Sequence, residues 1–158
     1  MQSSRIAVLC SLGLVSFLLG AEPADFSEPA PATIPFTQTY DFTSKINGAA
    51  YRIWITSPTK IDPVVAYPVL YVIDGNELAG TLGYVTTKLA GPDIVSVSIG
   101  YPGGLDEWRV RRILDLTPSS DPSAPANVKT GGADAFIRIL NEEIRPFVAS
   151  RFKLDPDR

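Results

Sequence analysis

The chain has 158 residues, of which 45% are hydrophobic and 20% are charged, and its formal net charge is -3. This composition fits one soluble domain with a sizeable core, and the acidic balance argues against a nucleic-acid partner. The sequence holds no His and one Cys, which excludes a Cys/His zinc site and an internal disulfide and removes the commonest general base. We therefore expect neither a metal nor a cofactor.

The first 21 residues (1–21) have the layout of a signal peptide. Residues 1–5 carry one positive charge, residues 6–19 are apolar, and Gly20-Ala21 supplies small residues before an acidic stretch. A membrane anchor, the alternative, needs about 18 or more apolar residues, and this run is shorter. The sequence therefore predicts export, to the periplasm or as a secreted protein, with membrane contact only through an uncleaved signal segment.

An extended lead-in is expected next, over residues 22–35, which are rich in Pro and Ala. Two runs of alternating apolar residues follow, at residues 38–44 and 51–57. Asn47-Gly48 lies between them and is typical of a hairpin turn. This part of the chain therefore predicts an antiparallel hairpin at the start of the folded domain.

A strand, a helix and a second strand are expected after a proline-bearing loop over residues 58–68. Residues 67–73 and 93–100 are short, apolar and β-branched, as in strands that are covered on both faces. Apolar residues at helical spacing separate the two runs: Leu78, Leu82, Val85 and Leu89. A unit of this length predicts a right-handed crossover between parallel strands.

A long loop and then an amphipathic helix over residues 133–152 complete the predicted elements, and Pro146 is expected to kink this helix. Its apolar stripe comprises Phe136, Ile139, Leu140, Ile144, Val148 and Phe152. Another buried parallel strand is expected after such a helix. The predicted fold class is therefore α/β, with an incomplete sheet that starts with the antiparallel hairpin and continues with parallel β-α units.

Four segments carry a resemblance to a known family. They are YPVLYVIDGN at residues 67–76, WRVRRILDLTPSS at 108–120, TGGADAFIRILNEEIRPFVASRF at 130–152 and LDPDR at 154–158. In this order they resemble the N-terminal half of an esterase branch of the α/β-hydrolase superfamily, which includes siderophore (enterobactin-type) esterases and is similar in build to S-formylglutathione hydrolase. The resemblance covers residues 36–158 and implies the N-terminal part of an α/β-hydrolase domain.

The resemblance also implies an activity. In this branch a Gly-x-Ser-x-Gly turn presents the nucleophile after the next strand, and an acid and a His follow. None of the triad is present in this sequence. The chain is thus expected to be the N-terminal portion of an exported serine carboxylic-ester hydrolase that acts on a small-molecule ester when full-length and is inactive alone. A non-catalytic binding module and a truncated remnant are alternatives.

One half of an oxyanion hole is implied at Asp74-Gly75-Asn76, directly after the first buried strand. The resemblance assigns the backbone N–H of Asn76 as a donor to the developing negative charge. Gly75 would permit a tight turn, with a positive φ as one way to make it, and a close backbone approach. The alternative is that these residues only end the strand.

Substrate-binding candidates follow the second buried strand: Tyr101, Trp108, Arg109 and Arg112. They are expected to border the mouth of the site, where an Arg fork would bind a carboxylate or catecholate oxygen. The alternative is a structural ion pair on a helical turn, between Asp115 and either Arg111 or Arg112. Further on, residues 131–134 are expected to start a helix, with an anion site there as the alternative.

Overall fold

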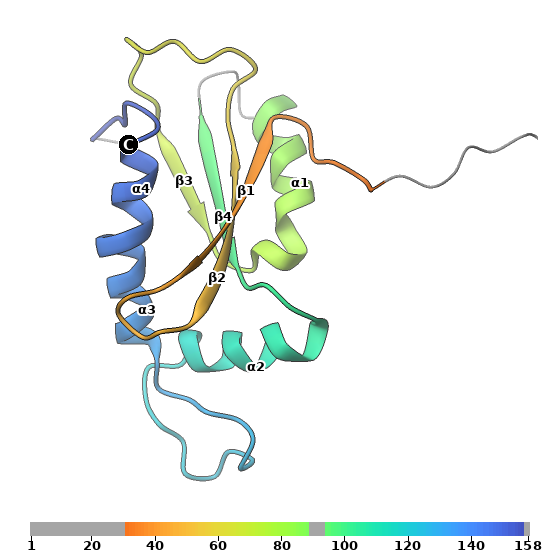
Figure 1. Cartoon of the computed structure of the whole chain (residues 1–158), viewed down its shortest axis with the longest axis vertical. Coiled ribbons are helices and arrows are strands. Elements are labelled where there is room, and N and C mark those ends of the chain that lie inside the picture. Colours follow the sequence, from red (N-terminus) through yellow and green to blue (C-terminus); the bar gives the residue numbers. More distant parts are fainter. Residues whose placement is uncertain (1–30, 89–93, 157–158) are drawn as a thin grey trace, which may run out of the picture. The chain divides into compact units, whose positions relative to one another are not determined.

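The four strands form one mixed sheet in the order β1-β2-β4-β3 (Figure 1). They span Thr37–Thr43 (β1), Ala50–Thr56 (β2), Val69–Val72 (β3) and Val95–Gly100 (β4). The computed structural model describes residues 31–88 and 94–156. Its helices and strands all belong to one compact unit, Ala32–Arg158. The predicted signal peptide and most of the predicted lead-in lie outside the described residues.

The predicted hairpin is confirmed. β1 and β2 pair antiparallel from Thr37 with Thr56 to Thr43 with Ala50. In the turn between them Gly48 has a φ of 71°. The Asn47 side chain accepts a hydrogen bond from the Ala49 N–H at 3.0 Å. Asn-Gly therefore supplies the left-handed residue and the local side-chain acceptor that this turn needs.

β4 is the central strand, because it pairs antiparallel with β2 and parallel with β3. All of its residues are buried, as predicted for a strand covered on both faces. The same prediction is wrong for β3, where Leu70 is 43% exposed. Among the described strands, β3 has β4 as its one neighbour and so lies at an edge. Beyond the end of the last helix, Leu154 forms a parallel bridge with Tyr67, just before β3.

Helix α1, Gly75–Lys88, connects β3 to β4 and begins earlier than the predicted apolar stripe. The prediction of a long loop after β4 is wrong over Leu105–Leu116, which form helix α2. The side chains that α2 buries are Trp108 and Asp115. Because one of the two is a carboxylate, α2 lacks the apolar stripe by which an amphipathic helix is found in a sequence.

The last predicted helix is observed as three successive segments: α3 at Ala133–Ile139, η1 at Leu140–Ile144 and α4 at Arg145–Ala149. Within η1 the hydrogen bonds have π-helical spacing, and the Arg145 N–H donates to the Leu140 carbonyl. Pro146 follows at once and has no N–H for an α-helical bond. The predicted disturbance at Pro146 therefore takes the form of a π turn, one of the known causes of irregularity in a helix.

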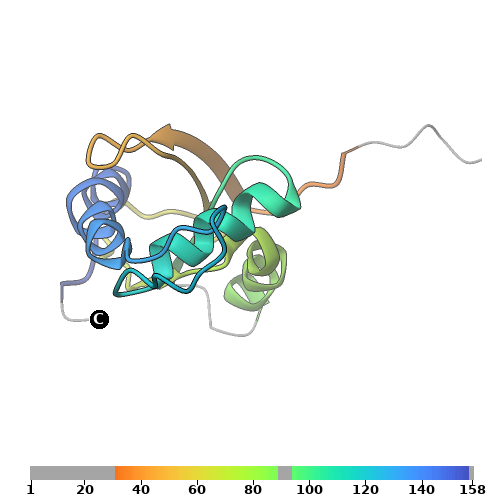
Figure 2. The same ribbon diagram turned by 90° about the horizontal axis from the view of Figure 1, so that it is seen from below.

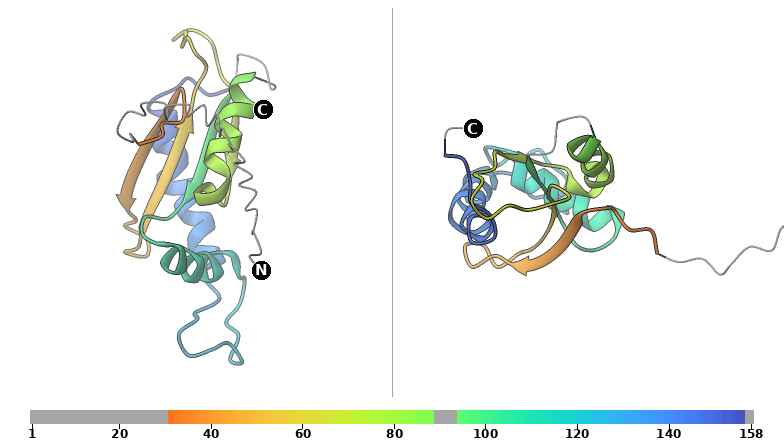
Figure 3. Two further views of the ribbon diagram at one scale, coloured as in Figure 1. Left: turned by 90° about the vertical axis from the view of Figure 1, so that its right-hand side faces the viewer. Right: turned by 90° about the horizontal axis from the view of Figure 1, so that it is seen from above.

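The helices cover the sheet in two layers. α1 lies on one face, and the α3–η1–α4 helix lies on the opposite face (Figures 1 and 3). α2 runs across the end of the sheet at which β4 finishes (Figure 2). The core side chains of β2 and β4 include Tyr51, Ile53, Val97 and Ile99, each at most 3% exposed. No helix in the described ranges has the length and apolar character needed to span a membrane.

Candidate functional site

The Asp74-Gly75-Asn76 corner is the first turn of α1, placed at the carboxyl end of β3. The N–H groups of Glu77 and Leu78 both donate to the Asp74 carbonyl at 2.9 Å, which starts the helix. Gly75 and Asn76 precede these donors, so their N–H groups belong to the turn that has no acceptor within the helix. The positive end of the helix dipole lies at the same place. An Asn76 N–H in this position can donate to an anionic oxygen.

Gly75 is required for space, and the positive φ expected there as one way to turn is found instead at Asp74, whose φ is 62°. A Cβ on Gly75 would lie 2.7 Å from the Trp54 ring and 3.0 Å from the Ile99 carbonyl carbon. The first distance is shorter than real Cβ contacts, and the second is at the tight end of their range. The helix start can therefore sit close to β2 and β4 only because residue 75 has no side chain.

The Asn76 side chain fixes the corner to the loop after β4. Its Nδ2 donates to the Tyr101 carbonyl at 2.7 Å, and its Oδ1 accepts from the Tyr101 N–H at 2.8 Å. A Cβ on Gly100 would collide with this side chain. The two hydrogen bonds hold the helix start against the segment that leads to α2.

Arg112 reaches the same corner from α2. Its guanidinium binds both carboxylate oxygens of Asp74, with an Nη2–Oδ2 distance of 2.9 Å and a second, shorter bond from Nε. The fork that sequence analysis assigned to a substrate oxygen thus holds a carboxylate of this chain. Binding of a substrate by Arg112 stays a prediction, and it would require Asp74 to share or release the guanidinium.

Of the other predicted site residues, Tyr101 and Trp108 are buried and Arg109 is exposed. Tyr101 and Trp108 are 5% and 7% exposed, so both rings belong to the core. The Arg109 guanidinium lies 5.7 Å from the centre of the Trp108 ring. The structure therefore brings together Asp74, Gly75, Asn76, Arg112 and the backbone of Tyr101. Contacts of Trp108 or Arg109 with this corner are absent from the described interactions.

A buried charge network lies behind the corner and was missed from the sequence. Tyr51 of β2 donates its hydroxyl hydrogen to Asp115 at 2.7 Å, and Arg111 donates to the Tyr51 oxygen at 2.7 Å. Arg111 also pairs with Asp115 at 2.9 Å, which settles the two predicted pairings in favour of Arg111. Burial raises the pKa of Asp115, although the Tyr51 hydroxyl and the Arg111 charge oppose this rise. The i,i+4 spacing identified one pair, but no local signal pointed to Tyr51.

Within the described ranges, no cluster of His, Cys, Asp or Glu has the arrangement of a metal site. The corner instead offers backbone N–H donors at a helix start and a guanidinium, and hydrogen bonds from the Asn76 side chain to Tyr101 hold it in place. Such a set can stabilise negative charge on an oxygen. It cannot by itself supply a nucleophile or a general base.

No family model matches the chain, but comparisons with curated proteins find relatives. The chain is 28% identical over 140 residues to the ferri-bacillibactin esterase BesA of Bacillus subtilis, covering 80% of this chain and 48% of BesA. It is 33% identical over 136 residues to the siderophore triacetylfusarinine C esterase of Aspergillus fumigatus, covering 78% of this chain and 44% of that enzyme. The chain is a homologue of siderophore esterases.

The structure of this siderophore-esterase homologue also matches a solved one. The BES protein from Bacillus cereus superposes with a TM-score of 0.72 at 29% identity, over 84% of this chain and 52% of that protein. The resemblance drawn from the four sequence segments and the α/β fold class are thereby confirmed. The homologue spans about half the length of the curated relatives it matches, and its α/β-hydrolase-type sheet is incomplete.

The candidate corner of the siderophore-esterase homologue lies where the carboxyl ends of the parallel strands β3 and β4 meet. Ligands of open α/β sheets collect at this edge. Asn76 follows β3, and Tyr101 follows β4. The hydrogen bonds between Asn76 and Tyr101 therefore join the two segments that follow these strands.

Proposed function

We propose that this chain forms the N-terminal half of an exported serine carboxylic-ester hydrolase that cleaves ester bonds of siderophores. The observation that supports this most directly is the Asn76 N–H at the start of α1, at the carboxyl end of β3. An α/β-hydrolase takes one oxyanion donor from the loop after its third strand. The names of the two curated relatives support siderophore esters as the substrate class.

The proposed role of the corner is to stabilise the negative charge that forms on the carbonyl oxygen of the ester. When a serine attacks an ester carbonyl, the carbonyl oxygen becomes an oxyanion, and a preorganised N–H lowers the barrier by several kcal/mol. Asn76 would supply this N–H, and its side-chain bonds to Tyr101 keep the donor from moving. Asp74 and Arg112 would hold the turn, and the pair would present a partly exposed guanidinium to an anionic part of the substrate.

The chain alone should not hydrolyse esters, because it contains no His and no Gly-x-Ser-x-Gly. Incubation of the purified chain with a fluorophosphonate probe should label no serine at a rate typical of hydrolases. Stoichiometric labelling at such a rate would contradict this part of the proposal.

Sequencing of the gene beyond the codon for Arg158 tests the esterase assignment itself. The expected result is a continuing reading frame that encodes a Gly-x-Ser-x-Gly and a His. The longer protein should then react with the fluorophosphonate probe and hydrolyse a siderophore ester. A stop codon at that place would count against the esterase and favour a binding module or a remnant.

Export has its own test, since the supporting observation is the charged, apolar and small-residue order of residues 1–21. Mass spectrometry of the exported protein should find a mature chain that begins near Ala21 or Glu22. A retained Met1 in the exported material would count against cleavage.

A further inference from the structure

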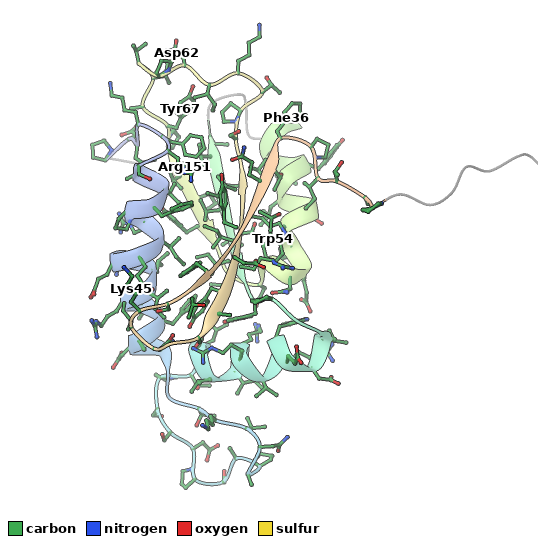
Figure 4. The ribbon with its side chains drawn as sticks, viewed as in Figure 1. Phe36, Lys45, Trp54, Asp62, Tyr67 and Arg151 are labelled. Carbon is green, nitrogen blue, oxygen red and sulfur yellow. The ribbon has the colours of Figure 1, made fainter. Side chains whose placement is uncertain are left out.

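A second candidate site lies on the side of the hairpin that faces the long helix, away from the Asp74-Gly75-Asn76 corner. It is a pocket of about 590 Å³ between β1, the hairpin turn and the η1–α4 part of the long helix. Figure 4 shows Lys45 at this turn, beside the helix. The pocket shares no lining residue with the oxyanion corner. Its volume falls within the range of small-molecule sites.

The pocket has an apolar wall, to which the hairpin and the long helix both contribute. Phe42 of β1 and Ile53 of β2 face Phe147 of α4 across it. Tyr40 packs edge-to-face on Phe147, with ring centres 5.1 Å apart. The Arg151 guanidinium lies 4.8 Å from the centre of the Phe147 ring. These contacts fix the rings, so the wall is preformed for a hydrocarbon group.

Glu143 gives the pocket its polar end. Its Oε1 accepts a hydrogen bond from the backbone N–H of Lys45 at 2.7 Å. Its Oε2 is buried and has no hydrogen-bond partner among the described residues. A buried carboxylate oxygen without a donor is costly, because it has lost water and gained nothing in exchange. Glu143 lies in the π turn that precedes Pro146 and is part of the pocket lining.

The other charged groups of the lining leave Glu143 as the carboxylate that is available to a cation. Asp41 binds Arg52 at 2.6 Å, and Glu142 binds Arg138 at 2.9 Å, so both of these carboxylates are already neutralised. Within the described residues, Glu143 forms no ion pair with an arginine. Among the described residues that line the pocket, Lys45 is the basic one, and its ammonium, on a flexible stem, would compete with a ligand for Glu143.

We propose that this pocket binds a small apolar ammonium compound. Its N–H groups donate to the Glu143 carboxylate, which turns about its side-chain bonds to bring the buried Oε2 into the pocket, and its hydrocarbon part lies against Phe42, Ile53 and Phe147. A charge-assisted bond to a carboxylate together with an apolar wall is the usual combination for recognising such a cation. The proposal does not depend on the esterase activity.

Two ligands of equal length and opposite charge test the proposal on the unaltered chain by isothermal titration calorimetry at neutral pH. Phenethylammonium should bind saturably, and 3-phenylpropionate should bind at least about tenfold more weakly, because only the cation can donate to Glu143. Equal affinities, or no saturable binding of phenethylammonium, would overturn the proposal.

Three variants locate the binding determinant. Glu143→Gln should weaken phenethylammonium binding about tenfold or more, whereas Glu77→Gln, a control on the exposed face of α1 and outside the pocket lining, should leave the affinity unchanged. Lys45→Met should tighten binding, since it removes the competing ammonium. Wild-type affinity in Glu143→Gln would refute the site. If Glu143→Gln failed to fold, the two ligands and Lys45→Met would still decide.

Discussion

At the residue scale, three consecutive residues at the start of α1 perform three different tasks. Asp74 takes the left-handed backbone conformation, Gly75 leaves room for Trp54, and Asn76 binds the Tyr101 backbone. The sequence predicted the importance of this corner and the need for Gly75 in a close approach. It did not show which residue would take the positive φ, because that depends on where the helix starts. Nor could it show that Trp54, far away in sequence, would supply the contact.

Gly75→Ala should destabilise the chain by about 1–3 kcal/mol, because its Cβ would overlap the Trp54 ring. Gly80→Ala is the matched control in the same helix, since a Cβ there meets nothing within 4 Å. That control should stabilise the chain by about 0.5–1 kcal/mol through helix propensity. Urea unfolding followed by circular dichroism measures both. Equal effects of the two substitutions would show that Trp54 does not restrict residue 75.

Asn76→Ala should cost about 1–3 kcal/mol of stability, because it removes both bonds to Tyr101 and leaves that backbone unpaired. In the proposed full-length esterase, Asn76→Pro should lower kcat about 10²–10³-fold more than Asn76→Ala does. Both variants lack the side-chain bonds, and only the proline lacks the N–H. Proline is tolerated in the first helical turn, and Gly75 before it has no Cβ to clash.

Kinetics of the two Asn76 variants, with circular dichroism to confirm folding, provide the measurement. Equal kcat values in folded Asn76→Ala and Asn76→Pro would show that the N–H is not an oxyanion donor. A loss confined to substrate affinity would point to positioning of the substrate instead.

At the scale of elements, α2 is attached to β2 by charge as well as by apolar contact. The Tyr51 hydroxyl accepts from Asn47 at 2.9 Å and from Arg111, and it donates to Asp115. Each polar atom of Tyr51 is thereby satisfied, which a buried network requires. The sequence did not predict α2, because its inward face carries Asp115. Where the inward face is apolar, as in the hairpin and the α3–η1–α4 helix, the elements were predicted well.

Tyr51→Phe should lower stability at neutral pH by about 1–3 kcal/mol, since Asp115 and Arg111 lose a buried partner. It should also change how the free energy of unfolding depends on pH in the alkaline range. Burial raises the pKa of Tyr51 to about 12, whereas the unfolded chain ionises near 10.0. The unfolded chain therefore releases this proton first. The contribution of Tyr51 is complete below pH 10 and is lost as pH rises from 10 to 12.

Urea unfolding across the alkaline range should thus show a smaller loss of stability in Tyr51→Phe than in the wild type. Tyr71→Phe is a control at neutral pH, because within the described structure the buried Tyr71 hydroxyl has no hydrogen-bond partner. Removing that hydroxyl should cost little. If Tyr71→Phe were as harmful as Tyr51→Phe, the network would not be the cause.

At the scale of the whole molecule, the sequence predicted the fold class, the hairpin and the parallel β3–β4 pair, because alternation and apolar runs are local signals. It did not predict the strand order, in which β4 lies between β2 and β3. That order depends on which strands bury each other. The candidate site was predicted in part for the same reason: the position of Asn76 follows from a strand end, whereas its bonds to Tyr101 and the Arg112–Asp74 pair need the folded sheet.

The exposed edge at β3 leads to a last prediction. β3 carries Leu70 at 43% exposure, and among the described strands it pairs with β4 alone. Unpaired strand edges invite pairing with another chain, and lysine on an edge strand opposes it. The purified chain should therefore associate with rising concentration in sedimentation velocity, and Leu70→Lys should suppress this association. Ile137→Lys on α3, where the side chain is 54% exposed, is the matched control and should not. Equal suppression by both lysines would assign the effect to net charge and remove the β3 edge as its cause.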